Sequence, residues 1–238
     1  MRGICMSYNI SFISEENLQK ECFSLFKKVM KAKEKSDKNF NKNRIDAFSA
    51  LFECGIRNIS LEDWIESEKQ RQFQKTLQNE IGYFHQKILG HIHGCQDLGT
   101  GNLIDFACPS KKIIAEIKNK YNTVKGSDQT VVYDNLKKCL TKPEYEGYTG
   151  YYVTIIPKNR GMSNFTPSDN RIHQKRPENP YIRAIDGISF YELLTGDEDA
   201  FFKIYAEVPK ILNSLSPSIY KHIEQEDLFL KNFNASYK

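Results

Sequence analysis

The sequence predicts an α/β (α+β) fold with a helical N-terminal portion. Apolar residues recur at helical spacing through most of residues 15–90, and two short apolar segments joined by a turn follow at 102–118. A further helical segment then leads to a strongly apolar strand at 149–156. A composition of 39% hydrophobic and 12% aromatic residues excludes a disordered chain, and 238 residues are enough to bury a sizeable core.

The first 90 residues are predicted to hold three helical segments. Residues Glu15–Lys35 carry apolar side chains at helical spacing and follow Ser14, a good N-cap. A second helix is predicted from Ile45 to Gly55, after a polar loop. From Ser60, another good N-cap, helical spacing continues as far as Gly90, which predicts one long helix or two joined helices.

Two apolar segments beyond residue 100 are predicted to pair as an antiparallel hairpin. Asn102–Ala107 and Ile113–Lys118 alternate or run apolar with β-branched residues, and Pro109–Lys112 between them is typical of a turn. If the two central turn residues form the tip, Asp105 lies opposite Glu116, with Cβ atoms about 4.5–5.5 Å apart. A register shifted by one residue would separate these two acids.

Three charged side chains in these apolar strands are the candidate catalytic residues, because strand interiors seldom accept charge. Glu116 and Lys118 share one strand face, since side chains alternate along a strand. The carboxylates of Asp105 and Glu116 suit a hard cation such as Mg²⁺, and the ammonium of Lys118 can orient or deprotonate a water. The pattern therefore outlines a site for phosphodiester hydrolysis. The competing interpretation is a surface hairpin with a cross-strand salt bridge.

The second half of the chain is predicted to continue with a helix at Ser127–Leu140 and a strand at Thr149–Ile156. Residues Pro157–Pro180 are rich in proline and asparagine and show no periodicity, which predicts an ordered loop or a segment that orders on a ligand. Three helices are expected near the C-terminus, at Ser189–Leu194, Asp197–Leu212 and Ser216–Phe229.

Several of these segments resemble the type II restriction endonucleases that cleave GGNCC sites. The similar segments are Gly82–Gly90, Gln96–Gly99, Glu116–Lys120, Asn122–Gly126, Ile155–Lys158, Phe165–Arg171 and Ile182–Tyr191. The resemblance spans most of residues 79–209 and implies the PD-(D/E)XK nuclease core, a mixed central sheet flanked by helices. Asp105, Glu116 and Lys118 match the acidic, acidic and basic positions of that motif, although Ile104 stands where the motif name has proline.

The resemblance implies a Mg²⁺-dependent endonuclease that hydrolyses double-stranded DNA at a short palindromic, GGNCC-like site and leaves 5′-phosphate ends. It also implies one or two Mg²⁺ per active site and a homodimer. A cognate DNA methyltransferase is expected as a partner in the same system, without direct contact with this protein. Asp105 and Glu116 would hold the metal, joined by the Ile117 carbonyl and by Glu80, with Asp97 as a further acid. The alternatives are a repair or recombination nuclease with the same fold and a non-catalytic DNA-binding module.

The candidate DNA-binding residues are basic, amide or hydroxyl side chains that follow the hairpin or lie in the 157–180 segment. Residues 157–176 hold five Lys or Arg and one Asp, whereas residues 186–207 hold six acids and one Lys, so the net charge of +4 hides an uneven distribution. A solvated basic face balanced by neighbouring acids is the alternative. The candidates are Asn119, Lys120, Asn122, Lys125, Ser127, Lys158, Arg160, Asn164, Ser168, Asn170, Arg171, Lys175 and Arg176.

The histidines and cysteines form no metal-binding pattern. Six cysteines lie at irregular spacings without a CxxC pair, so we expect reduced thiols, several of them buried. His91–Cys95 is predicted to be a turn leaving the long helix, because a zinc site needs a second Cys/His pair. His85 is expected to pack or hydrogen-bond near the site and not to act as a base.

We expect a single nuclease domain, 1–238, in the cytoplasm. Its parts are a helical N-terminal portion (1–60), a catalytic core (61–156), a DNA-reading loop (157–185) and C-terminal helices (186–238). No apolar run approaches the roughly 18 residues of a membrane helix, and the N-terminus does not resemble a signal peptide, so no membrane association is expected.

Overall fold

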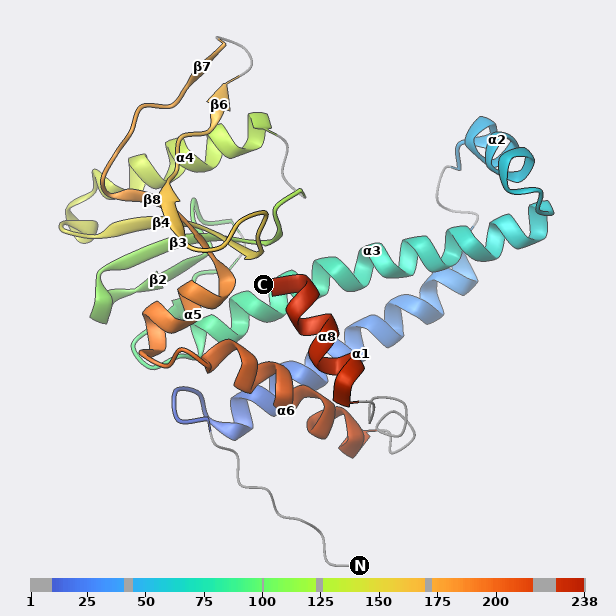
Figure 1. The fold of residues 1–238 in the computed structure, drawn as a ribbon, viewed down its shortest axis with the longest axis horizontal. Coiled ribbons are helices and arrows are strands. Elements are labelled where there is room, and N and C mark those ends of the chain that lie inside the picture. The colour runs from blue at the N-terminus through green and yellow to red at the C-terminus, as the bar shows by residue number, and fades with distance from the viewer. Residues whose placement is uncertain are drawn as a thin grey trace, which may run out of the picture. The chain divides into compact units, whose positions relative to one another are not determined.

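The structure is a computed structural model that describes residues 10–40, 45–99, 101–122, 126–169, 173–215 and 226–237 (Figure 1). The chain divides into two compact units, one formed by Met1–Cys22 with Phe84–Lys238 and the other by Phe23–Tyr83. That all 238 residues act as a single nuclease domain therefore stays a prediction.

Two long helices account for most of the first 90 residues. Helix α1 spans Glu15–Asn39 and begins as predicted, because the Ser14 hydroxyl accepts a hydrogen bond from the backbone N–H of Asn17 at 3.2 Å. Helix α3 spans Leu61–Gly90 without interruption, which decides between the one-helix and two-helix predictions. The hydroxyl of Ser60 caps it by accepting from the N–H of Asp63 at 3.1 Å.

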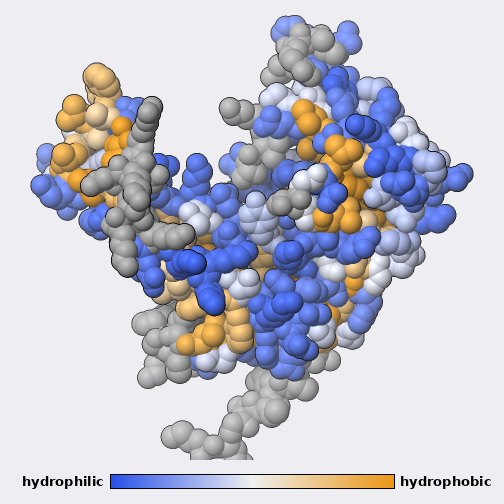
Figure 2. Space-filling view, turned by 180° about the vertical axis from the view of Figure 1, so that it is seen from behind, coloured by the Kyte–Doolittle hydropathy of each residue, from blue (hydrophilic) through white to orange (hydrophobic). Residues whose placement is uncertain are grey.

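Helix α2 spans Ala47–Arg57, two residues later than predicted at each end. Asp46 causes the shift, since its carboxylate accepts from the N–H groups of the second and third helical residues and fixes the start of the helix. One face of α2 exposes large apolar side chains, which form part of the orange area at the upper left of Figure 2: Phe48, Leu51, Phe52 and Ile56.

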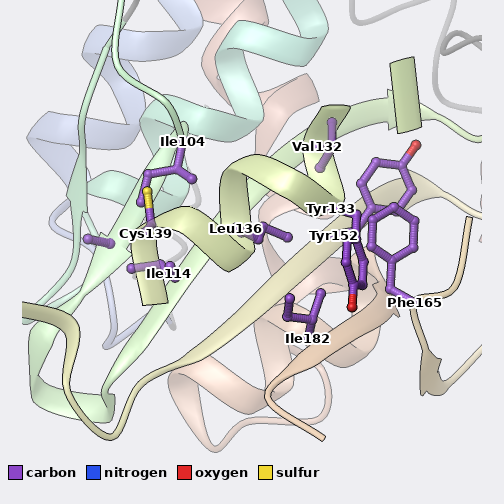
Figure 3. Close-up of a cluster of buried hydrophobic side chains, with 10 residues drawn as sticks. Ile104, Ile114, Val132, Tyr133, Leu136, Cys139, Tyr152, Phe165 and Ile182 are labelled. Carbon is purple, nitrogen blue, oxygen red and sulfur yellow. The ribbon is translucent and has the colours of Figure 1, made fainter. Parts of the chain in front are cut away.

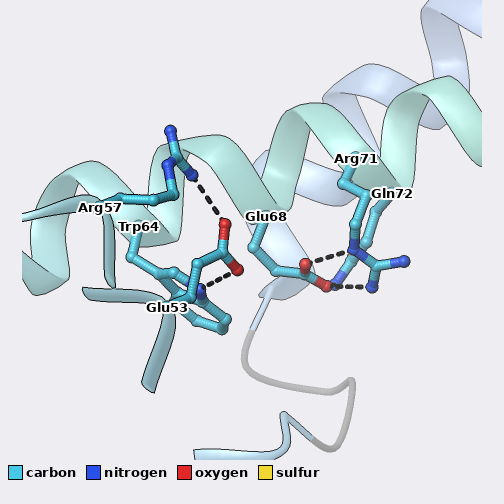
Figure 4. Close-up of polar contacts among 6 residues, drawn as sticks. All are labelled: Glu53, Arg57, Trp64, Glu68, Arg71 and Gln72. Atoms are coloured by element: carbon cyan, nitrogen blue, oxygen red, sulfur yellow. Dashed lines mark hydrogen bonds and ion pairs between the residues drawn. The ribbon is translucent and has the colours of Figure 1, made fainter. Parts of the chain in front are cut away.

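Polar contacts tie α2 to the start of α3 (Figure 4). Glu53 accepts from the Arg57 guanidinium at 2.7 Å and from the Trp64 indole at 2.9 Å, so a buried aromatic ring and an exposed cation share one carboxylate. One helical turn further along, Glu68 accepts from Arg71. The first contacts join the two helices, and the second stabilises α3 itself.

The larger unit is built on a six-stranded mixed sheet, in the order β1-β2-β3-β4-β8-β5. The pairs β3–β4 and β4–β8 are parallel and the others antiparallel. The strands are β1 (Gln96–Asp97), β2 (Phe106–Cys108), β3 (Ile113–Lys120), β4 (Thr149–Ile156), β5 (Met162–Asn164) and β8 (Ile182–Asp186).

Helices cover both faces of this sheet. Helix α4, Gly126–Leu140, packs on one face over a core cluster of side chains from the helix and from neighbouring strands (Figure 3). Helix α5, Gly187–Thr195, covers the opposite face, where Phe190 contacts Phe106 and Tyr151. The cluster under α4 comprises Ile104, Ala107, Ile114, Val132, Tyr133, Leu136, Cys139, Tyr152, Phe165 and Ile182.

The segment Pro157–Pro180 is more regular than its sequence predicts. It contributes β5 to the sheet edge and forms a second small sheet from β6 (Ser168–Asp169) and β7 (Gln174–Lys175). All three residues of β5 are exposed, so this edge strand lacks the alternation of buried apolar and exposed polar residues that predicts a strand. The prediction of a loop was therefore wrong at β5.

The C-terminal helices are α5, α6 (Ala200–Leu215) and α8 (Glu226–Tyr237). The predicted helix Ser216–Phe229 is partly outside the described residues, which omit 216–225, and the observed helix continues eight residues beyond Phe229. No helix in the described part of the chain is long and apolar enough to cross a membrane.

Candidate active site

The predicted hairpin forms with the predicted register. Strands β2 and β3 pair Phe106 with Ala115 and Cys108 with Ile113, and a short 3-10 turn at Pro109–Lys111 joins them. The next pair in this register is Asp105 with Glu116. The two acids therefore face each other, as the sequence predicts.

The first strand of this hairpin is shorter than predicted. Residues 101–105 bend, and β2 begins only at Phe106, so Asp105 lies just before the strand and not within it. The bend turns the Asp105 carboxylate toward β3, where its Oδ2 accepts from the backbone N–H of Ile117 at 2.9 Å. The backbone N–H of Asp105 also bonds back to β3, to the carbonyl of Ala115 at 3.1 Å.

Lys118 brings the two carboxylates together. Its Nζ lies 2.6 Å from Glu116 Oε1 and 3.9 Å from Asp105 Oδ2. The three side chains are partly buried, with exposures of 15% for Glu116, 23% for Asp105 and 28% for Lys118. They thus form a compact charged group that solvent still reaches.

Burial and like charge make this group electrostatically unusual. Burial raises the pKa of Asp105 above its ordinary value, against a lowering by hydrogen bonds and by the Lys118 charge. Burial also raises the pKa of Glu116, and the neighbouring charge of Asp105 adds to the rise. For Lys118, burial alone would lower the pKa, but the charges of Glu116 and Asp105 outweigh it and the pKa is raised. Lys118 is therefore protonated at neutral pH.

The sequence offers no direct sign that Gln86 belongs to this site. Its side chain, near the end of α3, hydrogen-bonds to Asp105 and helps to keep the pKa of that carboxyl from rising further. The weak signal is position, because Gln86 lies within the last turn and a half of the helix that leads to β1. Gln86 and Asp105 are 19 residues apart and belong to different elements, so a periodic pattern in the sequence cannot predict their contact.

The end of α3 also fixes Asp97, a further candidate acid. Lys87 binds its Oδ2 at 2.5 Å and the N–H of Gly99 donates to its Oδ1 at 3.1 Å, so both carboxylate oxygens have partners. Gly90 makes this packing possible, since a Cβ there would lie 2.6 Å from the backbone nitrogen of Asp97. The charge of Asp97 raises the pKa of Asp105, which places it within electrostatic reach of the acid pair.

Two other predicted residues have defined surroundings. Glu80, on α3 within the Phe23–Tyr83 unit, forms a salt bridge with Lys28 at 3.3 Å, and its place among the metal ligands stays a prediction. His85 is buried, with Nδ1 3.2 Å from the Tyr191 hydroxyl and its ring stacked on Phe201. Burial lowers its pKa to about 4, so it is neutral at pH 7 and packs, as predicted.

The candidate DNA-binding residues fall into two groups. The first follows Lys118: Asn119 and Lys120 complete β3, Asn122 is exposed in the next turn, and Ser127 is the second residue of α4. The second group surrounds β5, β6 and β7, where the exposed members are Lys158, Arg160, Asn164, Ser168 and Lys175. Lys125, Asn170 and Arg171 lie outside the described residues.

Two arginines of the second group are held by acids of the protein. Arg176 makes a paired contact with Asp134 at 2.8 and 3.0 Å and lies 3.2 Å from Asp169, a 4% exposed side chain. Arg160 lies 3.3 Å from the buried carboxylate of Asp186. Both arginines therefore have intramolecular partners that charge counting along the sequence does not reveal.

The carboxylate pair fits a divalent metal ion. Within the described ranges, no group of three or more His, Cys, Asp or Glu side chains could hold a metal. Asp105 and Glu116 nevertheless offer oxygen ligands of the kind that Mg²⁺ prefers. The burial and mutual repulsion that raise their pKa values are what a bound cation would offset.

The mixed sheet, the helices on both of its faces and the charged hairpin define an α+β fold of the restriction endonuclease class. Residues 10–216 match the model of a family described as Eco47II restriction endonuclease. The type II restriction enzyme Eco47II of Escherichia coli is 41% identical over 236 residues, 96% of this chain and 98% of that enzyme. The type II restriction enzyme Sau96I of Staphylococcus aureus is 36% identical over 211 residues, 86% of this chain and 80% of that enzyme.

The chain therefore belongs to the Eco47II restriction endonuclease family. Its enzyme class is that of a type II site-specific deoxyribonuclease, as the sequence resemblance predicts.

Proposed function

We propose that this protein hydrolyses both strands of double-stranded DNA at a short palindromic, GGNCC-like site, in a Mg²⁺-dependent reaction that leaves 5′-phosphate ends. The observation that carries the proposal is the convergence of Asp105, Glu116 and Lys118 at one end of a hairpin. A surface salt bridge alone would not need two acids whose pKa values are raised by burial.

Asp105 and Glu116 would hold one or two Mg²⁺, with the Ile117 carbonyl as a further ligand. The peptide of Ile117 lies beside the Asp105 carboxylate, to which its N–H donates at 2.9 Å. When bound, a divalent cation would polarise the scissile phosphate and lower the pKa of a coordinated water. Gln86 and the Ile117 N–H orient the Asp105 carboxylate for this role.

Lys118 orients the attacking water and stabilises negative charge on the phosphate. Its raised pKa keeps the ammonium protonated at neutral pH, so it acts first as a cation and a hydrogen-bond donor. The contact of 2.6 Å with Glu116 fixes the amine beside the carboxylates. This interpretation favours water orientation over deprotonation by Lys118 itself.

Cleavage of both strands of a palindromic site implies a homodimer, because each chain carries one such group of residues. Base reading and phosphate contacts would come from the two groups of DNA-binding candidates. We further propose that the protein works in the cytoplasm beside a cognate DNA methyltransferase without contacting it.

The test is digestion of two DNA duplexes that carry a GGNCC site, one with a central A·T pair and one with a central G·C pair, followed by mapping of both cut ends. We expect cleavage with Mg²⁺, none with EDTA, and specific binding without cleavage with Ca²⁺. A cut that leaves a 3′-phosphate, or activity that persists in EDTA, would contradict the proposed chemistry. Preferential cutting of branched or single-stranded DNA would favour a repair nuclease.

Matched variants assign the reaction to the hairpin. Lys118→Ala should lower the rate of cleavage by about 10²–10⁴-fold, since the ammonium acts on the reacting groups, while Ca²⁺-supported DNA binding persists. Lys111→Ala, at the exposed turn of the same hairpin, is the control and should cut normally. Normal cutting by the Lys118 variant would remove this residue from the mechanism.

A further inference from the structure

Two cysteines face each other at the edge of the sheet, away from the acid pair. The Sγ atoms of Cys95 and Cys108 lie 2.6 Å apart, closer than two non-bonded sulfur atoms in van der Waals contact. Cys108 is completely buried at the end of β2, and Cys95 is half-buried just before β1. The proposed hydrolysis uses neither thiol.

The backbone holds these residues at a distance suited to a disulfide. Strands β1 and β2 pair Gln96 with Ala107, so Cys95 and Cys108 are the next opposed residues in the same antiparallel register. Opposed residues in antiparallel strands have Cα atoms about 4.5–5.5 Å apart, within the range that disulfides require. Their Sγ contact shows that both side chains also point toward each other.

We propose that Cys95 and Cys108 form a reversible oxidation site, which a low-molecular-weight disulfide closes to an intramolecular disulfide bond. Cys95, the more accessible thiol, attacks one sulfur of the oxidant as a thiolate, and the first thiol of the oxidant leaves. Cys108 then attacks Cys95 Sγ as a thiolate and releases the second thiol. The two protein thiols lose two electrons and two protons, and the oxidant is reduced to two thiols.

The bond would close a loop of 14 residues that contains Asp97 and Asp105. The turns at its two ends are already packed closely, since a Cβ at Gly94 would lie 2.5 Å from the Ser110 hydroxyl. The disulfide therefore needs little movement of the backbone. We expect the oxidised protein to unfold at a higher temperature, because the cross-link restricts the unfolded chain, and to cut DNA as the reduced protein does.

Peptide mapping tests the proposal directly. The folded protein is treated with oxidised glutathione, unfolded in iodoacetamide and digested with trypsin. Both cysteines then fall in one peptide, residues 88–111, because the sequence has no Lys or Arg between Lys87 and Lys111. The expected peptide carries no alkyl group and is lighter than the unmodified dithiol peptide by two hydrogen atoms, about 2 Da. Dithiothreitol should restore double alkylation.

Replacing one cysteine at a time tests the two exchange steps separately. In Cys108→Ser, Cys95 should keep glutathione as a mixed disulfide, because the resolving thiol is absent. In Cys95→Ser, the buried Cys108 should stay reduced. Cys54→Ser, which removes a half-buried thiol elsewhere, is the control and should form the disulfide normally. Double alkylation of the wild-type peptide after glutathione treatment, or a disulfide that joins either cysteine to another position, would overturn the proposal.

Discussion

Asp105 and Glu116 carry their charges where burial and mutual repulsion disfavour ionisation. Their folded pKa values lie above the ordinary ones, so the metal-free folded state binds protons more readily than the unfolded state. The stability of the metal-free protein should therefore rise as the pH falls from the raised folded pKa values toward the ordinary values. The destabilisation is fully present above the raised pKa values. Under the proposed function, the same acids would favour metal binding at the expense of the metal-free fold.

Asp105→Asn should raise the unfolding temperature of the metal-free protein at neutral pH and abolish cleavage. The amide removes a partly buried negative charge, can still accept the hydrogen bond from Ile117, and leaves the pair of Glu116 and Lys118 in place. Calorimetry in EDTA at pH 7 and pH 5 measures this effect, which should shrink at the lower pH. A variant that unfolds at a lower temperature in EDTA would refute this account of the acid pair.

Gln86 is a positioning residue in this account, because it acts on Asp105 and not on the substrate. Gln86→Leu removes a hydrogen bond that lowers the pKa of Asp105, so that pKa should rise. We expect cleavage to fall by about 10–100-fold, and the acidic limb of the pH–rate profile to move to higher pH. A loss of rate without a shift of the profile would mean that Gln86 only supports packing.

At the scale of elements, much of the site was predictable because its pattern is local. The register of the hairpin follows from two apolar segments and a proline-containing turn, and helix α4 and strand β4 follow from periodicity. Strands β1, β5 and β8 were not predicted, since they are short and depend on neighbours distant in the sequence. The contact between Gln86 and Asp105 and that between Arg176 and Asp134 were unpredictable for the same reason.

Arg176 fastens the β6–β7 hairpin to α4, and replacing it should loosen that hairpin. Arg176→Gln leaves the buried Asp169 without this cation, which should lower the free energy of unfolding by about 1–3 kcal/mol. Urea denaturation and hydrogen exchange of residues 168–175 measure the effect. Lys175→Gln, at an exposed neighbouring site, is the control, with an expected change within about 0.5 kcal/mol. An unchanged stability with weaker DNA binding would show that Arg176 chiefly contacts DNA.

Across the whole molecule, charge counted along the sequence overstates the surface available to phosphates. Residues 157–176 hold five cations, but Arg160 and Arg176 already contact acids of the protein. Lys158 and Lys175 remain as exposed candidates in this segment. This segment should thus contribute fewer phosphate contacts to the salt dependence of DNA binding than its five cations would give.

The proposed cleavage of both strands predicts a dimer. Sedimentation of the protein with Ca²⁺ and one cognate duplex should give a protein mass of about twice the 27.7 kDa of one chain. A duplex with a scrambled site is the control and should bind more weakly. If one chain binds the cognate duplex and Mg²⁺ then produces only nicked DNA, each chain acts alone and the dimer is refuted.

Gly90 is a position where the packing between α3 and β1 leaves no room for a side chain. The obstacle that a Cβ would meet at this position is the backbone of Asp97, which no change of rotamer can remove. A diverged relative could keep the acid pair and the lysine and still be unable to bring the first strand of the sheet against the end of α3. We therefore expect relatives that share this packing to keep both the glycine and its spacing of seven residues from the aspartate, beside the proposed catalytic motif.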